Sequence, residues 1–204
     1  MTHIWHSEKV VFMRIFIAAL VLIFSFQSWT KADDISDFEI EGMSIGDSAL
    51  DYFSEEEIKK NTREHYNVKT FTVVQNDFLP FFEIYDAVDF DYKTGDKNYI
   101  IWGLSGIIFY QHNVKKCYEK QDEIIEILSE FFKDEGKFSK KKKTKHDADK
   151  SGNSINTQIK VKLKSGDIIS IHCNDYSKEH GGQDHLAVNI KTEEYNEFLR
   201  IAYE

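Results

Sequence analysis

The second half of the chain alternates hydrophobic and polar residues in short runs, a pattern typical of strands that bury one face. Three such runs follow one another: Thr157–Lys164, Asp167–Asn174 and Asp184–Ile190. Ser165-Gly166 separates the first two and predicts a tight turn. Because so short a turn leaves no room for a crossover helix, we expect neighbouring strands to be antiparallel.

The first half predicts further strands, less regularly spaced. β-branched and aromatic residues are concentrated in four runs: Val68 to Gln75, Phe82 to Tyr92, Asn98 to Trp102 and Ile107 to Tyr110. Gly95 lies between the second and third runs and predicts a hairpin turn. Gly103 and Gly106 interrupt the pattern, so we expect the fourth run to be a separate short strand.

Polar caps followed by apolar residues of helical period predict two amphipathic helices. Asn113 precedes the longer one, Val114 to Lys133, which Gly136 ends. A basic, polar connection follows, over residues 137–156. Thr192 caps the last helix, whose apolar residues recur at helical spacing: Tyr195, Phe198, Leu199, Ala202 and Tyr203.

These elements favour one fold class. Ser54 and Glu57 have the spacing of a capping box and add a short helix that ends near Asn61. Strands joined by turns, with few helices, predict an α+β fold: a mainly antiparallel sheet with helices packed on one face. Neither an internal repeat nor a linker divides residues 33–204, so we expect a single domain there.

The N-terminal residues have a different pattern. Met13-Arg14 precedes Ile15 to Phe26, which carries no charge, and this order is typical of a secretory signal peptide. The run is shorter than the roughly 20 apolar residues that a spanning helix needs. We therefore predict a signal peptide over residues 1–32, with translation starting at Met1 or Met13. The alternative is an uncleaved anchor from Val10 to Trp29.

The predicted destination and the composition limit the partners. A cleaved signal peptide implies a periplasmic or secreted domain without a stable membrane anchor. The net charge of −9 argues against nucleic acid or anionic lipid as a partner. Abundant aromatic residues and a single proline are not typical of a disordered chain.

The chain has two cysteines, Cys117 and Cys173, and an oxidising compartment permits a disulfide between them. Cys117 lies on the apolar stripe of the long predicted helix, and Cys173 shares a strand face with Ile169 and Ile171. Both are therefore expected to face the core. We predict a Cys117–Cys173 bridge that ties the helix to the sheet; the alternative is two buried free thiols.

One loop collects residues that can bind a metal. His172, Asp175, His180 and His185 lie close together around the turn between the last two predicted strands. His172 and His185 are expected to point away from the core. Imidazole and carboxylate groups are ligands of zinc, and an open coordination position can activate water. The spacing matches no known metalloenzyme signature, and a solvated hairpin loop is the simpler interpretation.

Two other acidic stretches are weaker candidates, one for calcium binding and one for acid–base chemistry. Asp147, Asp149 and Gly152 resemble the first half of a calcium-binding loop, but the bidentate glutamate expected at its end is replaced by Gln158. A polar loop is the simpler interpretation there too.

The second stretch contains Asp86, Asp89 and Asp91 in one predicted strand, and alternation separates Asp86 from the other two. Paired acid–base chemistry is therefore weakly supported. Four aromatic residues precede or begin this strand and are expected in the core: Phe78, Phe81, Phe82 and Tyr85.

Several segments resemble a family of small exported proteins of unknown function from marine bacteria with compact AT-rich genomes. They are residues 38–48 and 52–58, the helix bearing Cys117, and residues 172–176 with the terminal helix. That family implies no activity and no site residues. Since no catalytic or cofactor motif stands out, the sequence favours a non-enzymatic domain, without cofactor, that binds an envelope protein or a small ligand. The alternative is a metal-dependent hydrolase built on the histidine-rich loop.

Overall fold

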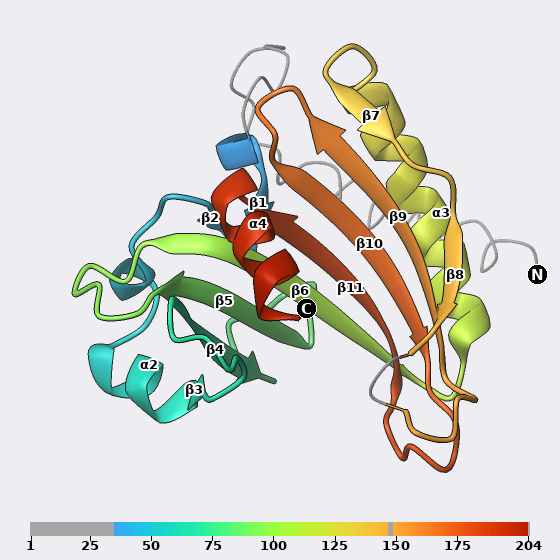
Figure 1. Ribbon diagram of the computed structural model, residues 1–204, viewed down its shortest axis with the longest axis horizontal. Coiled ribbons are helices and arrows are strands. Elements are labelled where there is room, and N and C mark those ends of the chain that lie inside the picture. The colour runs from blue at the N-terminus through green and yellow to red at the C-terminus, as the bar shows by residue number, and fades with distance from the viewer. Residues whose placement is uncertain (1–34, 147–148, 204) are drawn as a thin grey trace, which may run out of the picture. The chain divides into compact units, whose positions relative to one another are not determined.

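The computed structural model describes residues 35–146 and 149–203 (Figure 1). The predicted signal peptide, residues 1–32, lies outside the described residues. No helix in the described ranges is long and apolar enough to cross a membrane.

Nine strands of the described residues form one antiparallel sheet, in the order β3-β4-β5-β6-β11-β10-β9-β7, and β8 also pairs with β9. Their bounds are β3 Thr62–Arg63, β4 Phe71–Asp77, β5 Ala87–Lys93, β6 Ile101–Gln111, β7 Gly136–Phe138, β8 Lys142–Lys145, β9 Ile155–Leu163, β10 Ile168–Asp175 and β11 Asp184–Lys191. A separate pair joins β1 (Glu39–Ile40) to β2 (Met43–Ser44). The predicted α+β class with a mainly antiparallel sheet is confirmed.

The helices begin at the caps that the sequence predicts. Ser54 and Glu57 form both hydrogen bonds of a capping box ahead of α2 (Glu55–Asn61). Asn113 caps α3 (Val114–Phe131). Thr192 caps α4 (Glu193–Ala202) by accepting the Tyr195 backbone N–H at 3.1 Å. Short 3₁₀ turns lie at Ile35–Asp37 and Ala49–Asp51.

The two longer helices lie on opposite faces of the sheet, which corrects the expectation that the helices share one face. The core face carries Cys173 and Leu186, and α3 packs on it across β6, β10 and β11. The other face, called the polar face below, carries Asp91 and Lys191. There the Tyr195 ring of α4 lies against Gly103 of β6. Figure 1 shows α3 behind the sheet and α4 in front of it.

The glycines of β6 do not end the strand, so the prediction of a separate strand at Ile107 was wrong. β6 runs without a break from Ile101 to Gln111. A Cβ at Gly103 would overlap the Tyr195 ring on the polar face, and one at Gly106 would overlap the Tyr85 ring on the core face. The absence of side chains here serves close ring packing rather than a turn.

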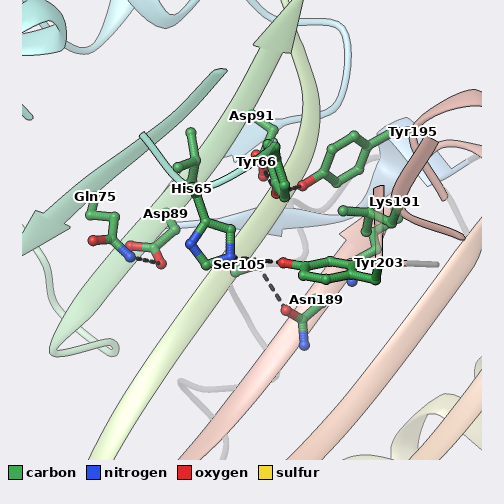
Figure 2. Close-up of a pocket in the computed structure, with 12 residues that line it drawn as sticks. His65, Tyr66, Gln75, Asp89, Asp91, Ser105, Asn189, Lys191, Tyr195 and Tyr203 are labelled. Atoms are coloured by element: carbon green, nitrogen blue, oxygen red, sulfur yellow. Dashed lines mark hydrogen bonds between the residues drawn. The ribbon is translucent and has the colours of Figure 1, made fainter. Parts of the chain in front are cut away.

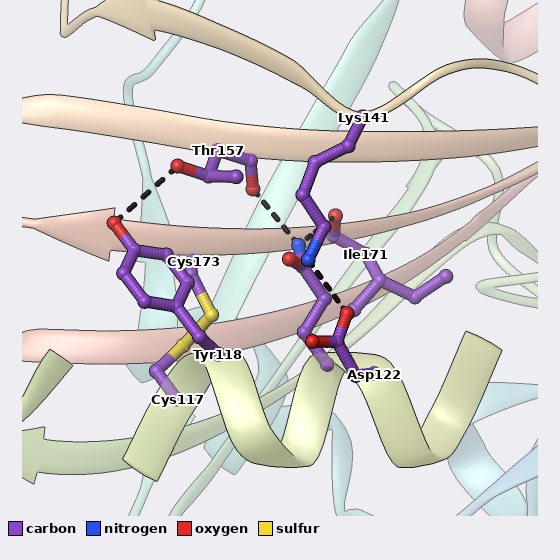
Figure 3. Close-up of polar contacts among 8 residues, drawn as sticks. Cys117, Tyr118, Asp122, Lys141, Thr157, Ile171 and Cys173 are labelled. Carbon is purple, nitrogen blue, oxygen red and sulfur yellow. Dashed lines mark hydrogen bonds and ion pairs between the residues drawn. A yellow bond between two sulfur atoms is a disulfide. The ribbon is translucent and has the colours of Figure 1, made fainter. Parts of the chain in front are cut away.

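The core lies between the sheet and α3, and covalent and polar contacts join the two. The Cys117–Cys173 disulfide is present, as predicted, with 5.9 Å between the Cα atoms. One turn along the helix, the buried Gln121 amide donates to the carbonyls of Thr157 (2.9 Å) and Ile171 (3.1 Å). Figure 3 shows these contacts on consecutive turns of α3. They fix how the helix lies on the sheet.

Two further expectations differ from the structure. The basic connection over residues 137–156 contains the short edge strands β7 and β8, which pair with β9 one after the other. Lysine-rich edges of this kind discourage pairing with other chains. In the aromatic stretch, Phe78 and Phe81 are 68% and 50% exposed, because they lie in the connection between β4 and β5 and not in a strand. Phe82 and Tyr85 do pack against the core.

Removing the disulfide is expected to cost much of the stability of this domain. The bridge closes a loop between residues 56 positions apart, for which the chain-entropy model gives about 4 kcal/mol. Replacement of Cys117 and Cys173 together by alanine should lower the free energy of unfolding by roughly that amount in urea denaturation. A reductant should then leave the double variant unaffected but destabilise the parent protein. An equal effect of reductant on both would contradict this role.

Candidate functional site

The polar face contains a pocket of about 190 Å³ next to α4 (Figure 2). Strands β4, β5, β6 and β11 provide its floor and walls. Residues His65 and Tyr66, from the segment between β3 and β4, close it from above together with Tyr195 and Tyr203. The pocket therefore joins three parts of the chain that lie far apart in the sequence.

Strand register explains its shape. Across the sheet, Asp89 of β5, Ser105 of β6 and Asn189 of β11 stand in one row. Small side chains on the central strand leave a trough between an acidic wall on β5 and a wall of amide and ammonium groups on β11. Because strands lie about 4.8 Å apart, the backbones of the two walls are about 10 Å apart.

The neighbouring row contains Asp91, Gly103 and Lys191. The side chains of Tyr66 and Tyr195, which close the pocket from above and form its roof, contact this row. Tyr195 occupies the space above Gly103, where a larger residue would exclude its ring. The Tyr66 hydroxyl donates to the Asp91 carboxylate at 3.0 Å and lies 2.6 Å from the Tyr195 hydroxyl. These bonds fasten the loop and the helix to the same buried carboxyl group.

A second contact joins the loop to the end of α4. His65 Nε2 lies 2.7 Å from the Tyr203 hydroxyl, and the two rings meet edge to face. Both residues are exposed, so this contact is at the rim of the pocket. The ion pair between Lys93 and Glu194, at 2.8 Å, ties the first turn of α4 to β5.

The two carboxyl groups in the pocket are poor at holding a negative charge. Burial raises the pKa of Asp91 to about 6, although hydrogen bonds from Tyr195 and Tyr66 oppose the rise. Burial also raises the pKa of Asp89 to about 7, and the nearby charges of Asp77 and Asp91 add to it. Among the described residues, Asp89 has one weak donor, the Gln75 amide at 3.4 Å, and the charge of Arg63 opposes the rise in its pKa. The ionised form of Asp89 is therefore short of hydrogen bonds.

Burial has the opposite effect on the pKa of Lys191. Burial lowers the pKa of its ammonium group to about 8, and the charge of Asp91 only partly compensates. Within the described ranges, no hydrogen-bond acceptor or ion-pair partner contacts this ammonium group. At neutral pH, the pocket thus contains an ammonium group that lacks a partner.

Ser105 does not have the surroundings of an activated nucleophile. Its hydroxyl donates to the side-chain oxygen of Asn189 at 2.8 Å. The Asn189 amide in turn donates to the Ser170 carbonyl at 3.3 Å. An amide cannot take a proton from serine as a histidine does, so these contacts position polar groups rather than activate them.

The predicted metal ligands are not brought together. His172 and His185 do share the polar face, as expected, but alternation along β10 places Asp175 on the core face. His180 instead stacks on Tyr176, with 4.4 Å between the ring centroids. In the part of the chain that the structure describes, no three His, Cys, Asp or Glu side chains are arranged to hold a metal ion.

The rings of both strand histidines are occupied by neutral partners. His172 lies within hydrogen-bond distance of the Gln158 and Asn156 amides, and burial lowers its pKa to about 3. His185 contacts the Asn174 amide at 2.8 Å. This part of the polar face is therefore a network of neutral imidazole and amide groups.

The calcium-like loop uses its carboxylate internally. Asp147 lies outside the described residues. The Asp149 carboxylate accepts hydrogen bonds from Ser151, Ser154 and Ser177. The bonds from Ser154 and Ser151 hold the pKa of Asp149 well below its usual range. Through Ser177, the loop is fastened to the β10–β11 hairpin. This arrangement fits the polar-loop interpretation.

Sequence reasoning found part of the pocket. Asp89 and Asp91 do share a face without Asp86, whose carboxylate accepts the Phe109 backbone N–H at 2.7 Å. Asn189 and Lys191 were missed. The signal for them was present, since polar residues at alternate positions of β11 indicate a face that is not packed against the core. Comparison with protein-family models, with curated proteins and with solved structures finds no match to this chain. The family resemblance therefore stays a prediction.

Neutralising Asp89 should stabilise the protein much more at alkaline pH than at acidic pH, because the penalty for its buried charge develops as the pH rises from the unfolded pKa of about 4 to the folded pKa of about 7. A carboxyl group whose pKa is about 7 when folded is protonated in the folded state at pH 4.5, so it carries no buried charge there. At pH 8 it is ionised in both states, and the folded state is penalised. The Asp89→Asn variant should therefore melt several degrees above the parent at pH 8, at roughly 3 °C per kcal/mol regained.

The matched control is Asp37→Asn, since Asp37 is an exposed aspartate of the same domain. Its melting temperature relative to the parent should not change between pH 4.5 and pH 8. If the Asp89→Asn advantage were also independent of pH, the carboxyl group would not be desolvated as described.

Proposed function

We propose that the chain is an exported, non-enzymatic binding domain that holds a small ligand in the pocket of the polar face. One observation carries the proposal: among the described residues, the Asp89 carboxyl group in the pocket has a single weak hydrogen-bond donor and the Lys191 ammonium group has no contacting acceptor. Burial of a charge without a partner is unfavourable. A ligand that provides the missing partners would recover that free energy on binding.

The size and the charge of the pocket favour a small molecule. The volume of the pocket is about 190 Å³. This is below the range of about 300–1,000 Å³ that is typical of drug-sized ligands. The net charge of −9 disfavours nucleic acid.

Two features support export and a binding role. A buried disulfide is typical of exported proteins and rare in reducing compartments. On the pocket floor, the hydroxyl of Ser105 faces an amide instead of a base. The alternative of a metal-dependent hydrolase gains no support from the described residues, because no three His, Cys, Asp or Glu side chains among them are arranged to hold a metal ion.

The proposal can be tested by filling the pocket. Ser105→Leu places a larger apolar side chain on its floor, and Ser129→Leu makes the same change on the exposed surface of α3. The probes are amino acids, ribose, glucose, nucleosides and simple amines, each assayed by thermal shift. A compound at 100 times its Kd stabilises by about 2.7 kcal/mol.

We expect at least one compound to raise the melting temperature of the parent and of Ser129→Leu by several degrees, and not that of Ser105→Leu. If no compound stabilises the parent, or if Ser105→Leu responds like the parent, the pocket is not the binding site.

A further inference from the structure

The charges of the pocket indicate which class of ligand it takes, and this inference rests on the proposed function. Asp89 stands on the β5 wall with a single weak donor at 3.4 Å. Lys191 stands on the β11 wall with no contacting acceptor among the described residues. The pocket thus presents a carboxyl group and an ammonium group on opposite walls of the trough, each with few or no hydrogen bonds from the described residues.

The geometry explains why these groups do not neutralise each other. Lys191 and Asp91 are in the same row, but the Tyr195 ring lies above Gly103 between them. Asp91 is instead satisfied by tyrosine hydroxyls. Asp89 is one row further along the sheet, beside Ser105. Asp89 and Lys191 thus line the pocket from β5 and β11, two strands that β6 separates (Figure 2).

We propose that the pocket binds a small amino acid as its zwitterion, with the ammonium group at Asp89 and the carboxylate at Lys191. The side chains of Gln75 and Asn189 line the pocket beside these two positions. Val73 and Leu199 offer apolar surface for a short aliphatic part. A zwitterion therefore brings an opposite charge to each of the two walls.

Ligands with one charge or none fit less well. A simple amine would leave Lys191 unmatched, and a simple carboxylate would leave Asp89 unmatched. A sugar provides hydrogen bonds but no charge, so neither Asp89 nor Lys191 would gain an opposite charge from it. The zwitterion is the class that satisfies both walls at once.

The test compares zwitterions with analogues that lack one charge. The probes are glycine, L-alanine, β-alanine and 4-aminobutyrate, with the amine and the carboxylic acid of each carbon skeleton, measured by calorimetry on the purified protein. At least one amino acid should bind ten times or more tightly than both of its analogues. An analogue that binds within threefold of its amino acid, or the absence of binding by all four amino acids, would overturn the inference.

Variants identify the groups that are responsible. Asp89→Asn and Lys191→Met should each weaken amino-acid binding tenfold or more, and each should abolish the preference over one analogue only. The controls Asp37→Asn and Lys178→Met make the same changes at exposed positions and should bind like the parent. If the pocket variants bind like the controls, the assignment of the charges is wrong. The analogue series needs no variant, so the inference stays testable even where one fails to fold.

The outcome also separates this inference from the proposed function. Ribose and glucose are measured in parallel on the parent and on Ser105→Leu. If a sugar binds the parent, loses binding in Ser105→Leu, and no amino acid binds, the pocket is a binding site for another class of ligand. If nothing binds, both the inference and the proposed function fail.

Discussion

The packing of Tyr195 on Gly103 is the contact on which the arrangement of the polar face depends. Because β6 has no side chain at this position, α4 can lie directly on the sheet. The ring also separates Asp91 from Lys191, and its hydroxyl meets Tyr66, which closes the roof. A single missing side chain thus seats the helix, keeps two charges apart and places the loop above the pocket.

The opposite face provides the stability that such a site requires. The disulfide at Cys117 and the amide of Gln121 attach α3 to β9 and β10, and the main hydrophobic cluster is enclosed beneath it. Desolvated charges on the polar face work against folding. We infer that the stability of the cross-linked core compensates for these unfavourable charges, as scaffolds commonly do for the binding sites that they support.

The fold was more accessible from sequence than the site. Strand alternation and caps such as Asn113 and Thr192 are local, so they predicted most elements and the core-facing cysteines correctly. The glycines of β6 misled, because their role depends on rings more than eighty residues away in Tyr195 and about twenty away in Tyr85. The histidine-rich loop was predicted as a site from its composition alone. The role of Lys191 could not be predicted in this way, because it depends on the strands and the helix that surround the side chain.

The most direct test of the account is to map binding by NMR on the ¹⁵N-labelled protein. Titration with a mixture of glycine, L-alanine, β-alanine and 4-aminobutyrate should shift the backbone amides of Gly103, Ser105 and Lys191 and the side-chain amide of Asn189, with little change elsewhere. Shifts confined to another surface, such as the exposed aromatic loop at residues 78–82 or the hairpin at residues 176–183, would contradict it. So would a spectrum that does not change at all.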